Sequence, residues 1–366
     1  MKLPALRIGD LIASIPIVQG GMGIGISLSK LASAVANAGG IGTISGILLG
    51  HSEPDYKTNF VGANIRALRN EIKKARKLSP KGILAANFLV AMNHYDEIVG
   101  AAVDEGIDIV VSGAGLPTNL PALVKESRTR IAPIVSSGKA ADVLSRLWDR
   151  NYGKTADMVI VEGPEAGGHL GFTEESLVRH ENKKLVDLVR DVIRVLAPFR
   201  EKYRKEIPVI AAGGIFTGKD IAEQLEAGAS GVQMATRFVA TEECDAAPEF
   251  KQAYLDAKQE DIVILRSPVG MPGRALNNRF IKETTAKQEV ITRCNQCIRG
   301  CNPKSAPYCI SKALVRSMEG NVKDGLVFVG SNAHRVTRIE TVRNLINHLV
   351  QEAEEVFQGR PAAVLT

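Results

Sequence analysis

No apolar stretch in the sequence approaches the roughly 20 consecutive residues that a membrane-spanning helix needs. The first ten residues, MKLPALRIGD, lack the continuous apolar segment of a secretory signal, and Asp10 and Pro16 interrupt the apolar run that follows. These absences predict a soluble, cytoplasmic protein without a membrane partner.

A concentrated basic surface is also absent, although the formal net charge is +6 and the pI is near 9.0. Lys and Arg are interspersed with Asp and Glu along most of the chain, so no stripe for nucleic-acid binding emerges. The mild basic excess suits small anions such as phosphates. We therefore expect a small-molecule substrate and no nucleic-acid partner, while the sequence leaves open whether the chain forms a homodimer.

Cysteine is scarce outside one segment, because four of the five cysteines lie between residues 294 and 309. Thiols stay reduced in the cytosol, so this grouping favours metal binding over a disulfide framework. Four thiolates this close in sequence predict an iron–sulfur cluster or a zinc ion, held by Cys294, Cys297, Cys301 and Cys309. Reduced thiols without a ligand are the alternative.

What the sequence does contain is a regular alternation of short β-branched apolar runs and amphipathic helical patterns. This alternation is typical of parallel strands linked by crossover helices, and fully apolar strands indicate a sheet buried on both faces. Eight strands are predicted, near Ile15–Gln19, Ile41–Ser45, Ile83–Leu89, Ile109–Ser112, Ile131–Val135, Met158–Glu162, Val209–Ala212 and Val232–Thr236. Helices predicted between them include Ser29–Ala38, Asp96–Glu105, Ala140–Asp149, Leu185–Arg200 and Lys219–Glu226.

Clusters of Gly, Asn or Ser follow most of these strands, and they favour one architecture. An open doubly wound sheet gathers its ligand contacts at one switch point, whereas a barrel collects loops from all its strands around one rim. The sequence therefore predicts an α/β fold, a (β/α)8 TIM barrel over residues 1–260. Residues 261–366 are expected to form a C-terminal extension packed on the barrel, with a strand at Ile262–Arg266, the four-cysteine cluster and a closing helix at Val342–Phe357. Two domains of ordinary size are the alternative.

Two glycine-rich motifs indicate a ligand site. After the first strand, the sequence QGGMGIG lets the backbone approach a flat ligand, but it is not a Rossmann fingerprint because Ile26 takes the third glycine position. After strand seven, Gly213 and Gly214 combine with Thr236 after strand eight. Barrels build a phosphate cradle from these two loops. The alternatives are a flexible loop for the first motif and tight helix–strand packing for the second.

A third motif, EGPEAGGHLG at residues 162–171, follows strand six and places His169 between glycines at the rim. Imidazole titrates near neutral pH, which suits a general base or a hydrogen-bond donor. A lone histidine is more often a surface or structural residue. The position of His169 directly after a barrel strand, which no other histidine shares, predicts a catalytic role.

Together, QGGMG after strand one, EAGGH after strand six, AAGGI after strand seven and QMATRF on strand eight resemble the nitronate monooxygenase family, formerly 2-nitropropane dioxygenases. Flavin-dependent enoyl-acyl-carrier-protein reductases of the same superfamily share these motifs. The resemblance includes the later sequence GRALN at residues 273–277. The cysteine segment departs from it; its early spacing is similar to the cluster motif of iron–sulfur flavoproteins of the old yellow enzyme type, with a shorter last gap.

This resemblance implies an FMN-dependent oxidoreductase in which His169 is catalytic. The leading function that it implies is oxidation of alkyl nitronates with O2. The alternatives are NAD(P)H-dependent reduction of an enoyl thioester or quinone and, from another class, a flavin-binding redox sensor or electron carrier. The residues that it assigns to the cofactor are Gly20, Gly21, Met22, Asn87, Glu162, Gly167, Gly168, Gly213, Gly214, Gln233, Ala235 and Thr236.

Overall fold

The computed structural model describes residues 2–359, and at its centre eight parallel strands form a closed barrel. Each strand pairs with the next along the chain, and β11 pairs with β3 to close the ring. The predicted (β/α)8 barrel is therefore confirmed. Its strands are β3 (Ile17–Gln19), β4 (Ile41–Ser45), β5 (Ile83–Leu89), β6 (Ile109–Gly113), β7 (Arg130–Val135), β8 (Val159–Glu162), β10 (Val209–Ala212) and β11 (Gly231–Met234).

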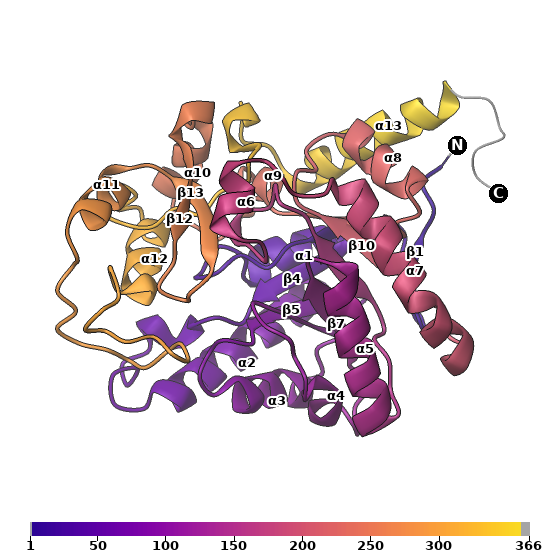
Figure 1. The fold of residues 1–366 in the computed structure, drawn as a ribbon, viewed down its shortest axis with the longest axis horizontal. Helices are drawn as coiled ribbons and strands as arrows, with labels where there is room; N and C mark the ends of the chain where they lie inside the picture. The colour runs from indigo at the N-terminus through magenta and orange to yellow at the C-terminus, as the bar shows by residue number, and fades with distance from the viewer. Residues whose placement is uncertain (1, 360–366) are drawn as a thin grey trace.

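Helices surround the barrel, and side-chain caps define where several of them begin (Figure 1). Thr217 and Asp220 form a capping box at the start of α8, and Ser137 caps α5. No helix within residues 2–359 has the length and apolar character required to cross a membrane. The helices are α1 (Ser29–Asn37), α2 (Phe60–Leu78), α3 (Tyr95–Asp104), α4 (Leu120–Leu123), α5 (Gly138–Tyr152), α6 (Glu174–Val178), α7 (Leu185–Tyr203), α8 (Gly218–Glu226), α9 (Thr236–Val239), α10 (Pro248–Leu255), α11 (Arg279–Ala286), α12 (Ile310–Met318) and α13 (Val342–Gln358), with 3-10 turns η1 (Leu49–Ser52), η2 (Gln259–Asp261) and η3 (Ala333–Arg335).

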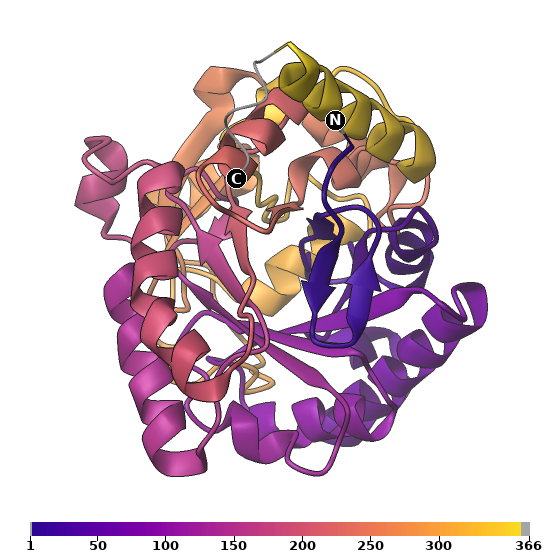
Figure 2. The ribbon, with the colours of Figure 1, turned by 90° about the vertical axis from the view of Figure 1, so that its right-hand side faces the viewer.

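A hairpin that precedes the barrel covers its N-terminal end. Strands β1 (Leu6–Ile8) and β2 (Leu11–Ala13) pair antiparallel, and Leu6 belongs to the same apolar cluster as Ile160 in the barrel interior. Figure 2 shows this end, with the indigo hairpin in front of the barrel and the orange C-terminal segments behind it. The hairpin was not predicted. It leaves the C-terminal ends of the strands as the open end, where TIM barrels carry their ligand sites.

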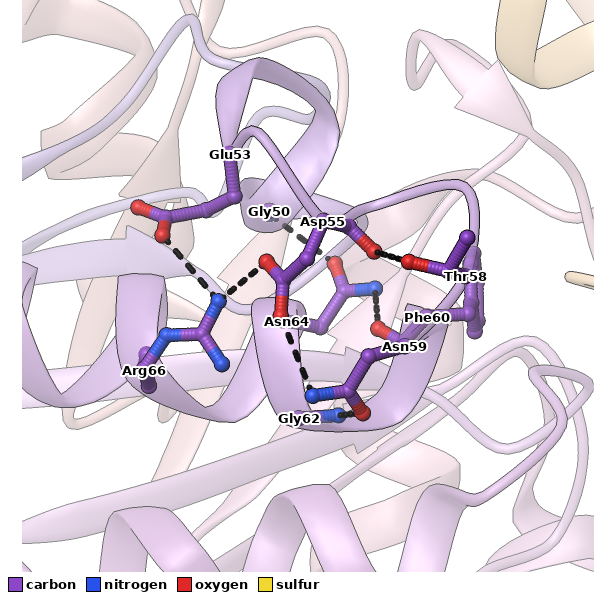
Figure 3. Close-up of polar contacts among 9 residues, drawn as sticks. All are labelled: Gly50, Glu53, Asp55, Thr58, Asn59, Phe60, Gly62, Asn64 and Arg66. Atoms are coloured by element: carbon purple, nitrogen blue, oxygen red, sulfur yellow. Dashed lines mark hydrogen bonds and ion pairs between the residues drawn. The ribbon is translucent and has the colours of Figure 1, made fainter.

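The loop after β4 is fixed by polar contacts at the start of α2 (Figure 3). The amide of Gly50 donates to Oδ1 of Asn64 at 3.0 Å, and the side-chain oxygen of Asn59 caps the first turn of α2. The guanidinium of Arg66 pairs with the carboxylate of Asp55. These local contacts hold a long βα loop in one conformation beside the rim of the barrel.

The segment after the barrel adds a second, small sheet at the rim. Strands β12 (Ile262–Arg266) and β13 (Pro272–Leu276) are antiparallel, and β13 also pairs with β9 (Gly168–His169) in the loop after β8. The predicted strand at Ile262–Arg266 is confirmed. Neither β9 nor β13 was predicted, because a two-residue strand beside glycines and a strand that contains Pro and Gly show no apolar alternation.

Helix α13 returns to the barrel and lies beside α8 (Figure 1). The amide of Gly218 donates to Glu352 at 2.7 Å, and no Cβ atom at Gly218 would fit against the backbone of Ala353. The predicted closing helix at Val342–Phe357 is therefore confirmed. Residues 360–366 of the predicted extension lie outside the described residues.

The last barrel strand ends earlier than the predicted Val232–Thr236. Strand β11 stops at Met234, and the carbonyl of Ala235 accepts bonds from the amides of Phe238 and Val239, which starts α9. The predicted strand is wrong in its last two residues because the backbone turns at Ala235. Thr236 consequently lies at the start of a short helix.

Candidate active site

A cavity at the C-terminal ends of the strands brings together the residues singled out in the sequence. His169 and every residue assigned to the cofactor line this cavity. What they bind stays a prediction, but their convergence from separate loops is a structural fact. They comprise Gly20, Gly21 and Met22 after β3, Asn87 on β5, Glu162, Gly167, Gly168 and His169 at the end of β8 and beyond, Gly213 and Gly214 after β10, and Gln233, Ala235 and Thr236 at β11 and α9.

Glycine backbone forms much of one wall of the cavity, at Gly20 and Gly21. The amide of Gly20 donates to the carbonyl of Met234 at 2.8 Å, which ties the loop after β3 to β11. A Cβ atom on Gly21 would overlap the side chain of Asn87. The amide of Met22 donates to Oγ of Ser27 at 2.9 Å. The fixed backbone leaves a surface that a planar ring system can approach without interference from Cβ atoms.

The loop after β10 lines the cavity with Gly213 and Gly214, whose φ angles are +93° and +80°. Residues that carry a side chain rarely adopt this backbone conformation. A Cβ atom on Gly213 would lie 3.0 Å from Ala166, and one on Gly214 would lie 2.9 Å from Cβ of Glu165. The two glycines are therefore required both by the backbone conformation and by the close approach of the loop after β8. Thr236 lines the same cavity at the start of α9.

Two polar side chains on the cavity wall lack protein partners. The Oε1 atom of Gln233 is buried without a hydrogen bond. The carboxyl group of Glu162 has no hydrogen bond or ion pair within residues 2–359, and burial raises its pKa to about 8. Buried polar groups normally have partners, so a polar ligand is the natural source of them here. A flat glycine wall, a glycine cradle and unpaired polar atoms together fit a flavin mononucleotide.

His169 occupies another part of the cavity wall, on β9. Its Nε2 atom lies 2.8 Å from Oγ of Ser267, and the edge of its ring meets Phe328, with ring centroids 5.0 Å apart. Part of the residue faces the cavity, yet the ring lies deep in the protein, and this burial lowers the pKa of His169 to about 4. The imidazole is therefore neutral at pH 7 and can accept a proton or donate a hydrogen bond.

The C-terminal segment supplies cavity residues that the sequence reasoning missed, namely Leu314 and residues 328–332. The side-chain amide of Asn332 donates to the carbonyl of Gly214 at 2.7 Å, and the amide of Ser331 donates to the carbonyl of Glu165 at 3.3 Å. The hydroxyl of Tyr254, another missed cavity residue, donates to the carbonyl of Phe328 at 2.7 Å. The sequence VGSN at 329–332 is a Gly/Ser/Asn cluster like those after the barrel strands, and this composition is the one local signal for its place in the cavity wall.

The expected metal site is not supported. Among residues 2–359, no group of three or more His, Cys, Asp or Glu side chains is arranged to hold a metal ion. Cys294 is exposed whereas Cys297 is buried, and Cys301 and Cys309 are intermediate. Burial, with a contribution from the neighbouring cysteines, raises the pKa of Cys297 to about 11. Proximity in sequence therefore did not produce a set of converging ligands.

Comparison with known proteins matches residues 7–352 to the family model for nitronate monooxygenase. A probable nitronate monooxygenase of Staphylococcus aureus (strain Newman) is 28% identical over 290 residues, which cover 73% of this chain and 77% of that protein. A probable nitronate monooxygenase of Staphylococcus saprophyticus is 26% identical over 302 residues, 77% of this chain and 81% of that protein.

Solved structures agree in fold. FabK from Thermotoga maritima superposes with a TM-score of 0.72 at 28% identity and covers 94% of both chains. Nitroalkane oxidase from Streptomyces ansochromogenes superposes with a TM-score of 0.73 at 24% identity, over 94% of this chain and 97% of that one. With the family model matching nearly the whole described chain, the protein belongs to the nitronate monooxygenase family of flavin-dependent oxidoreductases.

Proposed function

We propose that the cavity binds FMN. The fit rests on the glycine wall beside Asn87, on the positive φ angles of Gly213 and Gly214, and on the unpaired Oε1 atom of Gln233. Glu162, whose pKa burial raises to about 8, would be neutral at pH 7 and able to donate a hydrogen bond to the cofactor. The ring system is assigned to Gly20, Gly21, Met22 and Asn87, the ring and ribityl chain to Gly167 and Gly168, and the phosphate to Gly213, Gly214, Gln233, Ala235 and Thr236.

We further propose that the enzyme oxidises alkyl nitronates with O2. Bound FMN would supply the redox chemistry, taking electrons from the nitronate and passing them to O2. The family match and the names of the curated relatives support this substrate class. The single observation that carries it is the imidazole of His169, whose pKa is lowered by burial, on the wall of the glycine-lined cavity.

His169 provides the proton chemistry in this proposal. A neutral nitroalkane carries an acidic α-proton, which the imidazole of His169 can accept because burial keeps the ring unprotonated at neutral pH. A nitronate has already lost that proton and needs only to be held. The ring of Phe328 beside His169 and the side chains of Ile47 and Leu314 give the cavity apolar surface that suits an alkyl group.

A second candidate, reduction of an enoyl thioester with NAD(P)H, is favoured by one observation. FabK from Thermotoga maritima is as similar in sequence to this chain, at 28% identity, as the curated nitronate monooxygenase of Staphylococcus aureus. The two reactions require different electron donors to the flavin, which makes them separable.

The test mixes flavin-loaded enzyme anaerobically with NADH, with NADPH and with an alkyl nitronate, and follows the flavin absorbance. We expect the nitronate to bleach the flavin, O2 to restore its colour, and neither nicotinamide to reduce it rapidly. Rapid bleaching by NADH or NADPH, with reoxidation by an enoyl thioester and no nitronate turnover, would establish the reductase instead. A flavin that responds to none of them would favour a binding role.

A further inference from the structure

Helix α8 begins shortly after the glycine cradle, but carboxylates of the protein already occupy its start. The amides of Phe216 and Thr217 donate to Oδ2 of Asp220 at 2.9 and 2.8 Å. The amide of Gly218 donates to Oε2 of Glu352 at 2.7 Å. A helix start usually offers free amides to a phosphate. Here three of those amides are taken, and two negative charges lie beside them.

Amides without an acceptor remain earlier in the same loop. Within residues 2–359, the amides of Gly213 and Gly214 donate no hydrogen bond, and both glycines line the cavity. Such amides can bind a phosphate, but they supply partial charges rather than a full positive charge. Glu165 lines the same cavity and adds a further carboxyl group. A cation near the cradle would therefore strengthen the binding of an anionic ligand.

Two arginine side chains lie against the buried ring of Phe216 in this loop. The Cζ atoms of Arg237 and Arg335 are 4.8 and 4.4 Å from the ring centroid. The guanidinium of Arg237 pairs with the carboxylate of Glu340 at 3.0 Å. The guanidinium of Arg335 has no ion pair within residues 2–359, and its one hydrogen bond there goes to Oδ1 of Asn332 at 3.3 Å. Arg335 is therefore the uncompensated charge of the two.

The segment that carries Arg335 lies directly against both loops of the cradle. A Cβ atom on Gly330 would lie 2.7 Å from Oγ1 of Thr236. The side-chain amide of Asn332 donates to the carbonyl of Gly214 at 2.7 Å, so one side-chain amide separates the guanidinium of Arg335 from the cradle. Arg335 is exposed and stands outside the cavity lining. It can therefore act on a ligand in the cradle through its charge rather than by contact.

We propose that Arg335 is a specificity-determining residue that attracts the phosphate of FMN to the cradle and so favours the phosphorylated flavin over riboflavin. This inference rests on the proposed binding of FMN. A phosphate monoester carries a charge of about −1.5 to −2 at pH 7, whereas riboflavin lacks that group. The guanidinium of Arg335 stays charged at every accessible pH, and its planar stack on Phe216 limits the positions that it can take.

The test titrates flavin-free protein with FMN and with riboflavin and does not depend on turnover. At low ionic strength, Arg335→Gln should raise the Kd for FMN by about 3 to 10-fold, the size expected for one exposed charge acting on a dianion. The Kd for riboflavin should stay unchanged. Arg335→Lys keeps the charge and should recover most of the loss. An equal rise in both Kd values, or no rise for FMN, would overturn the proposal.

Salt separates the charge of Arg335 from mere support of Asn332. Charges interact over about 30 Å at ~0.01 M salt and over about 3 Å at ~1 M. The difference in FMN affinity between the wild type and Arg335→Gln should therefore be largest at low salt and nearly vanish at ~1 M. A difference that is independent of salt would show that Arg335 only holds Asn332 in place, and the charge would have no role.

Arg343→Gln is the matched control, because it removes the same formal charge from an exposed position in the first turn of α13. Arg343 has no contact with the ring of Phe216 in the described chain, so its loss should leave the ratio of the two flavin affinities unchanged. An effect as large as that of Arg335→Gln would contradict a specific role for Arg335. A wild type that binds neither flavin would refute the proposed function, whereas flavin affinities that do not respond to Arg335→Gln would refute this inference alone.

Discussion

Two groups of residues at the site are built in different ways. The group assigned to phosphate, called the backbone end below, consists mainly of backbone at Gly213 and Gly214, held by the loop after β8. The group assigned to catalysis, called the side-chain end below, consists of His169 on the cavity wall with Ser267 and Phe328 against its ring, from three separate parts of the chain. A site made of backbone is sensitive to any added Cβ atom and insensitive to pH. A site made of side chains depends on the identity and the protonation state of each residue.

The largest expected effect is at the side-chain end. His169→Ala should reduce turnover of a neutral nitroalkane by ~100 to 10,000-fold, as is typical for loss of a positioned acid or base. The flavin spectrum should stay unchanged, because the glycine cradle does not depend on His169. Steady-state kinetics with nitroalkane and nitronate measure the effect, and His348→Ala, outside the cavity lining, is the control. Wild-type kcat/KM on both substrates would remove His169 from the mechanism.

The protonation of His169 gives the same end of the cavity a pH signature. Burial lowers its pKa to about 4, so the neutral base is present above that pH and is lost as the pH falls through it. In the wild type, kcat/KM for a neutral nitroalkane should therefore fall on the acid side only toward pH 4. An acid limb near pH 6.5, the ordinary range of histidine, would show that the ring is not buried in the working enzyme.

The backbone end should respond to a single methyl group. Gly214→Ala introduces a Cβ atom 2.9 Å from Glu165 at a φ of +80°. The strain of about 1–2 kcal/mol should weaken FMN binding by ~5 to 30-fold. Flavin titration measures this change in Kd, and kcat at saturating FMN should change little. Gly106→Ala, with a φ of +76° and open space, is the matched control and should leave flavin affinity unchanged.

The same contrast explains what could be predicted from the sequence. Three strands, Ile41–Ser45, Ile83–Leu89 and Val209–Ala212, have the predicted bounds, because each is a short, mainly apolar run that contains β-branched or aromatic residues. The glycine motifs and His169 are local signals that directly follow barrel strands. Ser267 and Phe328 carry no local signal, because their contacts with His169 depend on how β12, β13 and the later segment pack on the barrel.

The ionisation of Glu162 can be tested through the stability of the protein, because its side chain lacks a partner in the described chain. Burial raises its pKa to about 8 from the ordinary carboxyl range near 4.5. The folded state therefore retains a proton that the unfolded state has lost, so this group destabilises flavin-free protein increasingly as the pH rises from 4.5 to 8. Glu162→Gln removes the ionisation. The Tm of the flavin-free variant should exceed that of the wild type at pH 8 by about 1–2 °C for each kcal/mol regained, and by much less at pH 5. A Tm difference that is independent of pH would contradict the raised pKa.

The smallest effect is expected where the C-terminal segment meets the backbone end of the cavity. Asn332 donates from its side-chain amide to the carbonyl of Gly214 at 2.7 Å, and Asn332→Ala removes this bond at a cost of ~1 kcal/mol. If the segment helps to hold the glycine cradle, part of that cost should appear as a roughly five-fold or smaller rise in the Kd for FMN. Asn278→Ala is the matched control, because Asn278 also donates to backbone carbonyls, of Val322 and Gly325, but outside the cavity lining. That variant should lower Tm without changing flavin affinity. Equal flavin affinities in the wild type and Asn332→Ala, with a lowered Tm in both variants, would mean that the C-terminal segment covers the cradle without shaping it.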